Sequence, residues 1–166
     1  IALQVRALMG PGIDPHSYRQ TRSDITALAK ADLVLWHGLY LEAQMEDFLT
    51  ALGARTSVVA VAESLPPELL RGHPAYPDRF DPHVWMDVAA WGSCVDVIVG
   101  ALSEHDATHA DAFKANAIPL HAQLRALHEY GLTSIASIPP SNRILVTSHD
   151  AFSYFGRAYG LEVVGV

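Results

Sequence analysis

Residues 107–137 read ATHADAFKANAIPLHAQLRALHEYGLTSIAS and carry one continuous helical pattern. Their apolar side chains recur at mostly three- and four-residue steps, at Phe113, Ile118, Leu120, Leu124 and Leu127. This spacing is typical of a helix with one buried face. Pro119 and Gly131 weaken the pattern without ending it. A helix of this length is unusual within a compact domain, so the stretch predicts a helical rod that joins two parts of the fold.

On both sides of this rod, short apolar stretches alternate with helical ones. We expect strands at residues 1–9, 32–37, 57–62, 143–147 and 161–166. We expect helices at residues 21–30, 41–52, 87–102 and 151–159. Thr21 and Asp87 are placed to cap the first and third of these helices, and Gly53 to end the second. Prolines at positions 66, 67, 74 and 77 exclude regular structure from the stretch between residues 63 and 82.

The alternation of strands and helices predicts the fold class. Continuously apolar strands between helices are typical of an α/β fold whose parallel sheets are covered on both faces. We therefore expect two parallel-sheet α/β lobes bridged by one long helix. Residues 1–104 would form the first lobe and residues 105–138 the linking helix. Residues 139–166 would begin a second lobe that is truncated at Val166.

Composition narrows the classes of partner. Half of the 166 residues are apolar, so the chain can bury a hydrophobic core. The formal net charge of −7 argues against nucleic acid and anionic membrane surfaces, because both attract basic proteins. No stretch approaches the roughly 20 apolar residues of a membrane span. The single cysteine, Cys94, excludes an internal disulfide and a cysteine-rich zinc site, and its apolar surroundings predict a buried position.

Three of the nine histidines share a distinctive setting, just past a strand or loop end and beside an aspartate. His16 lies in the sequence GIDPHSY, His83 in DPHVWMD, and His149 between the strand-like ILVTS and Asp150. The carboxyl ends of parallel strands face one crevice, where ligands bind. Proline also fixes the backbone immediately before His16 and His83. The sequence therefore predicts that these three imidazoles converge.

The residues alone leave other interpretations open. A loop histidine is more often solvated or hydrogen-bonded than a metal ligand, and the neighbouring aspartates can be helix caps or loop braces as well as ligands. His105 and His109 have a spacing that can chelate a metal, but no glutamate pattern accompanies them. A solvated helix face is the better interpretation there. His37 and His73 have no supporting context.

Three stretches together resemble one family. They are residues 8–18 (LMGPGIDPHSY), 81–87 (DPHVWMD) and 145–155 (LVTSHDAFSYF). They are similar to the signatures of the TroA-like, or ZnuA-like (cluster A-I), solute-binding proteins of zinc and manganese ABC importers. The resemblance spans nearly the whole chain, with the three stretches in the expected order and at the expected intervals.

The resemblance implies a fold and a set of ligands. The family's fold is two α/β lobes bridged by one long rigid helix, with the metal in the cleft between them. His16 and His83 would be the ligands from the first lobe and His149 the first ligand from the second. The resemblance also leads us to expect a fourth, acidic ligand beyond residue 166, and a first lobe without its opening strand and helix in this chain. The short stretch at 63–82 favours the receptors that handle manganese as well as zinc.

The resemblance also implies a function without covalent chemistry. The protein would capture Zn²⁺ or Mn²⁺ outside the cytoplasmic membrane and deliver it to the permease of an ABC importer with its ATPase. We expect a periplasmic or otherwise extracytoplasmic location, with lipid anchoring left open, and no signal segment in this chain. A truncated second lobe would expose the strand at residues 163–166, which favours self-association.

Two alternatives belong to other functional classes. Three histidines and a water also form the site of a zinc hydrolase, for which Asp14, Asp81 or Asp150 would be the general base. A downstream acidic ligand would close that water position. A metal-dependent adhesin would share the same three-histidine site. A permease gene adjacent to the gene of this protein would favour the transport receptor over the adhesin. Three imidazoles and a carboxylate suit zinc better than manganese. The metal affinity should fall in acid, because histidine and carboxylate ligands bind a metal only when deprotonated.

Overall fold

The computed structural model describes residues 3–73 and 76–165. The helices in this part of the chain are α1 (Arg22–Leu28), α2 (Glu46–Leu52), α3 (Val88–His105), α4 (Ala110–Ala136) and α5 (Ser153–Tyr159). The strands are β1 (Leu33–Trp36), β2 (Ser57–Ala60), β3 (Ile144–Thr147) and β4 (Glu162–Gly165). Short 3-10 turns lie at Pro67–Leu69, Val84–Met86, Ala107–His109 and Pro140–Asn142.

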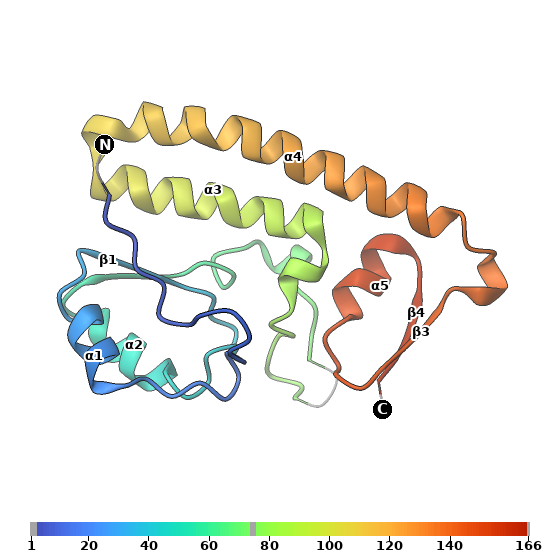
Figure 1. The fold of residues 1–166 in the computed structure, drawn as a ribbon, viewed down its shortest axis with the longest axis horizontal. Coiled ribbons are helices and arrows are strands. Elements are labelled where there is room, and N and C mark those ends of the chain that lie inside the picture. The colour runs from blue at the N-terminus through green and yellow to red at the C-terminus, as the bar shows by residue number, and fades with distance from the viewer. Residues whose placement is uncertain (1–2, 74–75, 166) are drawn as a thin grey trace.

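The strands form two separate parallel pairs. Leu33 of β1 lies opposite Ser57 of β2, and Ile144 of β3 lies opposite Glu162 of β4. Each pair is connected through a helix, α2 in the first and α5 in the second, as parallel strands require. Figure 1 shows the two units at opposite ends of the molecule, with α4 running past both. The predicted α/β class, with parallel sheets and one long helix, is confirmed.

The long helix is half of a helical hairpin. α3 continues to His105, the turn Ala107–His109 reverses the chain, and α4 then packs back along α3 and contacts α5 (Figure 1). α4 has 27 residues and keeps Pro119 inside it. The predicted helix over 107–137 is thus confirmed in extent, within a few residues at each end. By running back along α3, helix α4 brings β3, α5 and β4 beside the start of α3.

Local capping explains where the helices begin. The Thr21 side chain accepts from the Asp24 N–H and the Asp24 carboxylate accepts from the Thr21 N–H, which is a capping box. The Asp87 carboxylate accepts from the N–H groups of Ala89 and Ala90 at the start of α3. Gly53 ends α2. These three predictions, which depend on neighbours in sequence, are confirmed.

The predicted strand at residues 1–9 is wrong for its described part. Residues 3–9 form no strand, and Val5 is 88% exposed. The first two residues lie outside the described part of the chain. A strand requires a hydrogen-bonded partner, and β1 pairs with β2 instead. The irregular structure expected between residues 63 and 82 is confirmed for residues 63–73 and 76–82, apart from the turn Pro67–Leu69 and one bridge between Gly72 and Phe80. Residues 74 and 75 lie outside the described part of the chain.

Two hydrophobic clusters hold these elements together. The first lies between α1, β1 and α2 and contains Leu28, Val34, Met45 and Leu49. The second joins the loops after β1 and β2 to α3 and α5, and contains Leu39, Val61, Ala62, Leu65, Val84, Ala90, Cys94 and Tyr154. Tyr154 of α5 is fully buried in it, so the two ends of the molecule share one core. Cys94 is buried as predicted. Within the described ranges, none of the helices has the length and apolar character to cross a membrane.

Candidate metal centre

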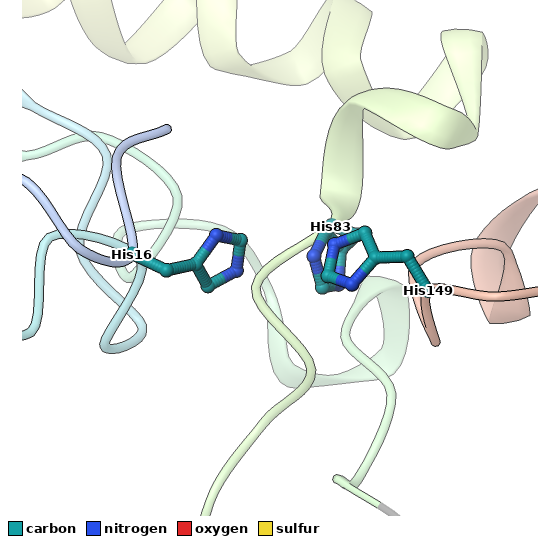
Figure 2. Close-up of side chains that lie close together, drawn as sticks. All are labelled: His16, His83 and His149. Carbon is teal, nitrogen blue, oxygen red and sulfur yellow. The ribbon is translucent and has the colours of Figure 1, made fainter. Parts of the chain in front are cut away.

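His16, His83 and His149 meet at one point. Each ring offers a nitrogen, and these three atoms all lie within 4.8 Å of one another. The ring centroids are 5.2 Å apart for His16 and His83, 5.4 Å for His16 and His149, and 5.0 Å for His83 and His149. Figure 2 shows the three side chains approaching from three separate segments. The predicted convergence is confirmed.

Three loops bring the rings together. His16 follows a turn in which the Ile13 N–H donates to the Gly10 carbonyl and Gly12 adopts a φ of 82°. Glycine adopts that left-handed conformation without a steric penalty. His83 immediately precedes the turn Val84–Met86 that leads into α3. His149 lies between β3 and α5, and its carbonyl accepts from the Thr147 hydroxyl at 3.0 Å.

The two Asp-Pro-His triplets use the same local geometry. Asp14 Oδ1 accepts from the His16 N–H at 3.0 Å and lies 2.9 Å from His16 Nδ1. Asp81 Oδ1 accepts from the His83 N–H at 3.0 Å and lies 2.7 Å from His83 Nδ1. In this structure both aspartates brace a histidine. A carboxylate partner keeps the proton on Nδ1 and leaves the Nε2 lone pair free.

The charge state of the two aspartates fits this role. The hydrogen bond from His16 lowers the pKa of Asp14. Burial raises the pKa of Asp81, but hydrogen bonds from His83 and Ser153 outweigh it, and the net pKa is below the usual value. Both groups are therefore ionised at neutral pH. An ionised partner accepts a hydrogen bond from Nδ1 and so fixes the orientation and the tautomer of the ring.

The three rings differ in burial. His83 is buried, His16 is half-buried and His149 is exposed. His83 Nε2 is a buried nitrogen that has no hydrogen-bond partner among the described residues. An unpartnered buried polar atom costs free energy unless a ligand satisfies it. Across residues 3–73 and 76–165, no other group of three or more histidine, cysteine or acidic side chains comes this close together.

Sequence reasoning missed His37. Its Nε2 lies 2.6 Å from the Pro82 carbonyl and therefore donates to it, which fixes the backbone immediately before His83. The ring packs against Trp85 and Trp91. Burial lowers the pKa of His37 to about 4, so the ring is neutral. A usable signal was present: His37 directly follows β1, at the carboxyl end that faces the crevice.

The remaining histidine predictions concern the helices. His109 pairs with Asp106 at 2.6 Å and His121 with Asp96 at 3.0 Å. His105 is the last residue of α3 and His109 belongs to the turn Ala107–His109, so the two are not on one helix and the helical i, i+4 geometry for chelation is absent. Neither joins the cluster of three rings.

Comparison with known proteins shows which family the chain belongs to. The chain matches the family described as zinc-uptake complex component A, periplasmic (ZnuA), over residues 2–166. It is 44% identical over 165 residues to the manganese-binding lipoprotein MntA of Bacillus subtilis, covering 99% of this chain and 53% of that protein. It is 39% identical over 165 residues to the zinc-binding protein TroA of Treponema pallidum, with the same coverage of each.

A solved structure shows the same fold. The periplasmic zinc-binding protein TroA of Treponema pallidum superposes with a TM-score of 0.91 at 39% identity, covering 96% of this chain and 57% of that one. The chain thus spans about half the length of the curated relatives it matches.

Proposed function

The chain belongs to the ZnuA family of periplasmic zinc-uptake components, and we propose that it captures a divalent metal ion, Zn²⁺ or Mn²⁺, outside the cytoplasmic membrane. It then delivers the ion to the permease of an ABC importer with its ATPase. One observation carries this proposal: three imidazole nitrogens lie within 4.8 Å of one another.

His16, His83 and His149 are the proposed ligands. His16 and His83 would bind through Nε2, because Asp14 and Asp81 occupy their Nδ1 atoms. The orphaned Nε2 of His83 supports this assignment. Zinc favours four ligands, and the family resemblance implies that the fourth is an acidic side chain beyond residue 166. These roles are proposals, as is the division into lobes at residues 1–104, 105–138 and 139–166.

The arrangement suits reversible capture of an ion. The rings come from three separate loops, so a bound ion would link β3 and α5 to the rest of the molecule. His149 is exposed, and it is the ligand that can leave first. A nitrogen-rich set favours zinc over manganese by intrinsic affinity. Relatives are named for either metal, so the ion carried in the cell would depend on availability.

Location and partners follow from the same proposal. One relative is a lipoprotein and another is periplasmic, which supports an extracytoplasmic location. Ile144, Val146 and Val164 of the β3–β4 unit are exposed. Self-association through this apolar surface remains a prediction that sedimentation at increasing concentration can test.

A zinc hydrolase is the less supported alternative. It needs a general base free to act beside a metal-bound water. Asp14 and Asp81, two of the three candidates, are already hydrogen-bonded to His16 and His83. The metal-dependent adhesin predicts the same site and is separated by measuring metal uptake in cells.

The test is a zinc titration of chelator-stripped protein against a chromophoric competitor. The site variant changes His16, His83 and His149 to Ala, and the matched control changes His105, His109 and His121 to Ala. We expect one-to-one binding that is lost in the site variant and kept in the control. Loss in the control with retention in the site variant would assign the ion to the helices instead.

A further inference from the structure

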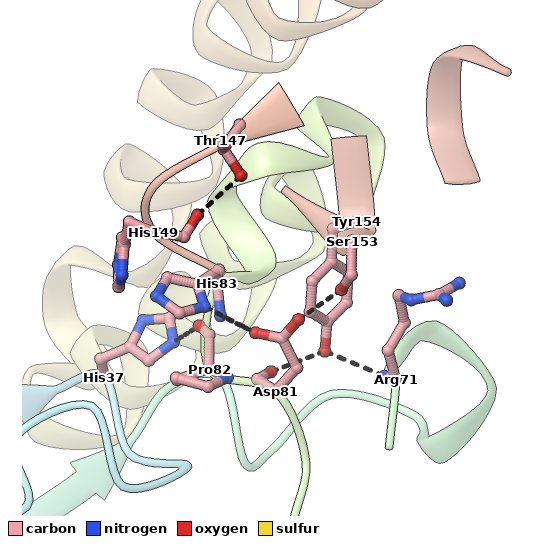
Figure 3. A network of polar contacts seen from close by, with 9 residues as sticks. All are labelled: His37, Arg71, Asp81, Pro82, His83, Thr147, His149, Ser153 and Tyr154. Carbon is pink, nitrogen blue, oxygen red and sulfur yellow. Dashed lines mark hydrogen bonds and ion pairs between the residues drawn. The ribbon is translucent and has the colours of Figure 1, made fainter. Parts of the chain in front are cut away.

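Helix α5 holds the loop that carries His83. The Ser153 hydroxyl donates to Asp81 Oδ2, and the Tyr154 hydroxyl donates to the Asp81 carbonyl at 2.9 Å. The same Tyr154 oxygen accepts from the Arg71 N–H at 2.9 Å. Arg157, one turn later, donates to the Leu69 carbonyl at 2.8 Å. Figure 3 shows the Ser153 and Tyr154 contacts meeting at Asp81 beside His83.

Asp81 is therefore fixed at both carboxylate oxygens. Oδ1 accepts from the backbone N–H and Nδ1 of His83, while Oδ2 accepts from Ser153. Asp81 is only 2% exposed, so water cannot readily replace a lost donor. With donors on both oxygens, the carboxylate plane cannot rotate without breaking a bond. The His83 ring inherits that orientation.

The other triplet provides an internal comparison. Asp14 Oδ2 accepts from the Ser17 hydroxyl at 3.1 Å, so the same carboxylate and hydroxyl pattern recurs. Ser17 lies three residues from Asp14 on the same exposed loop. Ser153 lies 72 residues from Asp81, on the helix that follows His149. The brace of His16 is thus entirely local, whereas the brace of His83 also depends on a residue that is distant in sequence.

We propose that Ser153 is a positioning residue for the metal site: through Asp81 it fixes His83 and so couples that ligand to His149. Tyr154 anchors the same loop through the Asp81 carbonyl. A displacement of α5 that withdraws His149 also removes the donor from Asp81 and loosens His83. Two ligands on different segments are then lost together, which favours abrupt release of the ion. This inference rests on the proposed function, because it assigns His83 and His149 as ligands.

The experiment is a double-mutant cycle on zinc affinity. We expect Ser153→Ala to weaken binding roughly tenfold and Asp81→Ala by about 10- to 100-fold, the range for partners that orient metal-ligating histidines. The double variant should bind no more weakly than Asp81→Ala alone, since Ser153 acts through Asp81. Ser153→Thr, which restores the hydroxyl, should bind as the unmodified protein does. Ser64→Ala, which removes a hydroxyl that donates to the Ala60 carbonyl, is the control.

A measurement without metal separates this inference from the proposed function. Nitrogen NMR of labelled histidines should show His83 protonated at Nδ1, with Asp81→Ala mixing the two neutral tautomers and Ser153→Ala shifting the signals partway in the same direction. Additive affinity losses, or unchanged His83 signals in Ser153→Ala, would overturn the positioning role. Absence of zinc binding by the unmodified protein would contradict the proposed function instead, and the metal-free spectra would still decide the role of Ser153.

Discussion

His83 and Asp81 form a buried pair, with Nδ1 lying 2.7 Å from Oδ1, while Nε2 of the same ring has no hydrogen-bond partner among the described residues. The pair fixes which nitrogen is protonated before any ion arrives. Holding a ligand in its binding orientation reduces the ordering cost of binding. Removing Asp14 or Asp81 should therefore weaken zinc binding measurably, although neither is a proposed ligand.

The difference in burial between Asp81 and Asp14 should make their effects on zinc affinity unequal. We expect Asp81→Ala to weaken zinc binding more than Asp14→Ala, because Asp14 is exposed and water can replace its oxygen beside His16. Competition titration measures both, with Asp111→Ala on the exposed face of α4 as the control. Losses at Asp14 or Asp81 no larger than in Asp111→Ala would show that the braces do not support ligation.

His37 should make the metal-free protein less stable in mild acid. Burial depresses the pKa of His37 to about 4, whereas a histidine in an unfolded chain titrates near 6.5. As the pH falls below about 6.5, the unfolded chain takes up a proton that the folded protein does not. The contribution of neutral His37 to the free energy of unfolding is therefore fully present above about pH 6.5. It is lost as the pH falls toward about 4, by up to roughly 3 kcal/mol.

Urea unfolding across that pH range measures the loss. His37→Gln keeps a donor for the Pro82 carbonyl but does not titrate, so its stability should depend less on pH. An identical pH dependence in the variant and the unmodified protein would assign the loss to other groups.

The hydroxyl of Tyr154 should contribute to stability independently of metal. Tyr154→Phe keeps the buried ring but leaves the Arg71 N–H and the Asp81 carbonyl without this partner. We expect a loss of about 1–3 kcal/mol in the free energy of unfolding, the usual cost of an unpaired buried polar group. Tyr130→Phe on exposed α4 should change it by less than about 0.5 kcal/mol. Equal effects would mean that water replaces the lost bonds.

Two helix glycines should respond oppositely to alanine. A Cβ at Gly131 would lie 2.6 Å from the Tyr159 ring, where α4 meets α5. A Cβ at Gly100 of α3 would meet nothing within 4 Å. We expect Gly100→Ala to stabilise the fold by about 0.4–1 kcal/mol. Gly131→Ala should destabilise it by about 1–3 kcal/mol through overpacking. Thermal unfolding compares the pair, and stabilisation by both would show that α5 can shift away from α4.

Features of the fold and the site that depend on residues close in sequence could be predicted more reliably than features that depend on distant residues. The caps at Thr21 and Asp87 depend on residues up to three positions away, and both form as predicted. The strand expected at 1–9 depends on a distant partner, and its described part does not form. The three histidines converge as predicted, but the strand-end argument applies only to His149, which comes after β3. His16 and His83 lie on loops with no strand immediately before them.

The supporting residues were less accessible to sequence reasoning. His37 acts on Pro82, 45 residues away, and Ser153 acts on Asp81, 72 residues away. Neither residue type indicates such a contact without the packing of α5 and the loop after β1. The sequence therefore reveals the candidate ligands and offers the neighbouring aspartates as braces, whereas only the structure reveals the distant contacts of His37 and Ser153.

One ion should bind between His16, His83 and His149. The most direct test is a crystal structure of the zinc-loaded protein with an anomalous difference map at the zinc absorption edge. We expect a single strong peak about 2.0–2.1 Å from Nε2 of His16, Nε2 of His83 and one ring nitrogen of His149. A peak beside Asp96 and His121 on α3 and α4, with the three loop imidazoles left without metal, would contradict it.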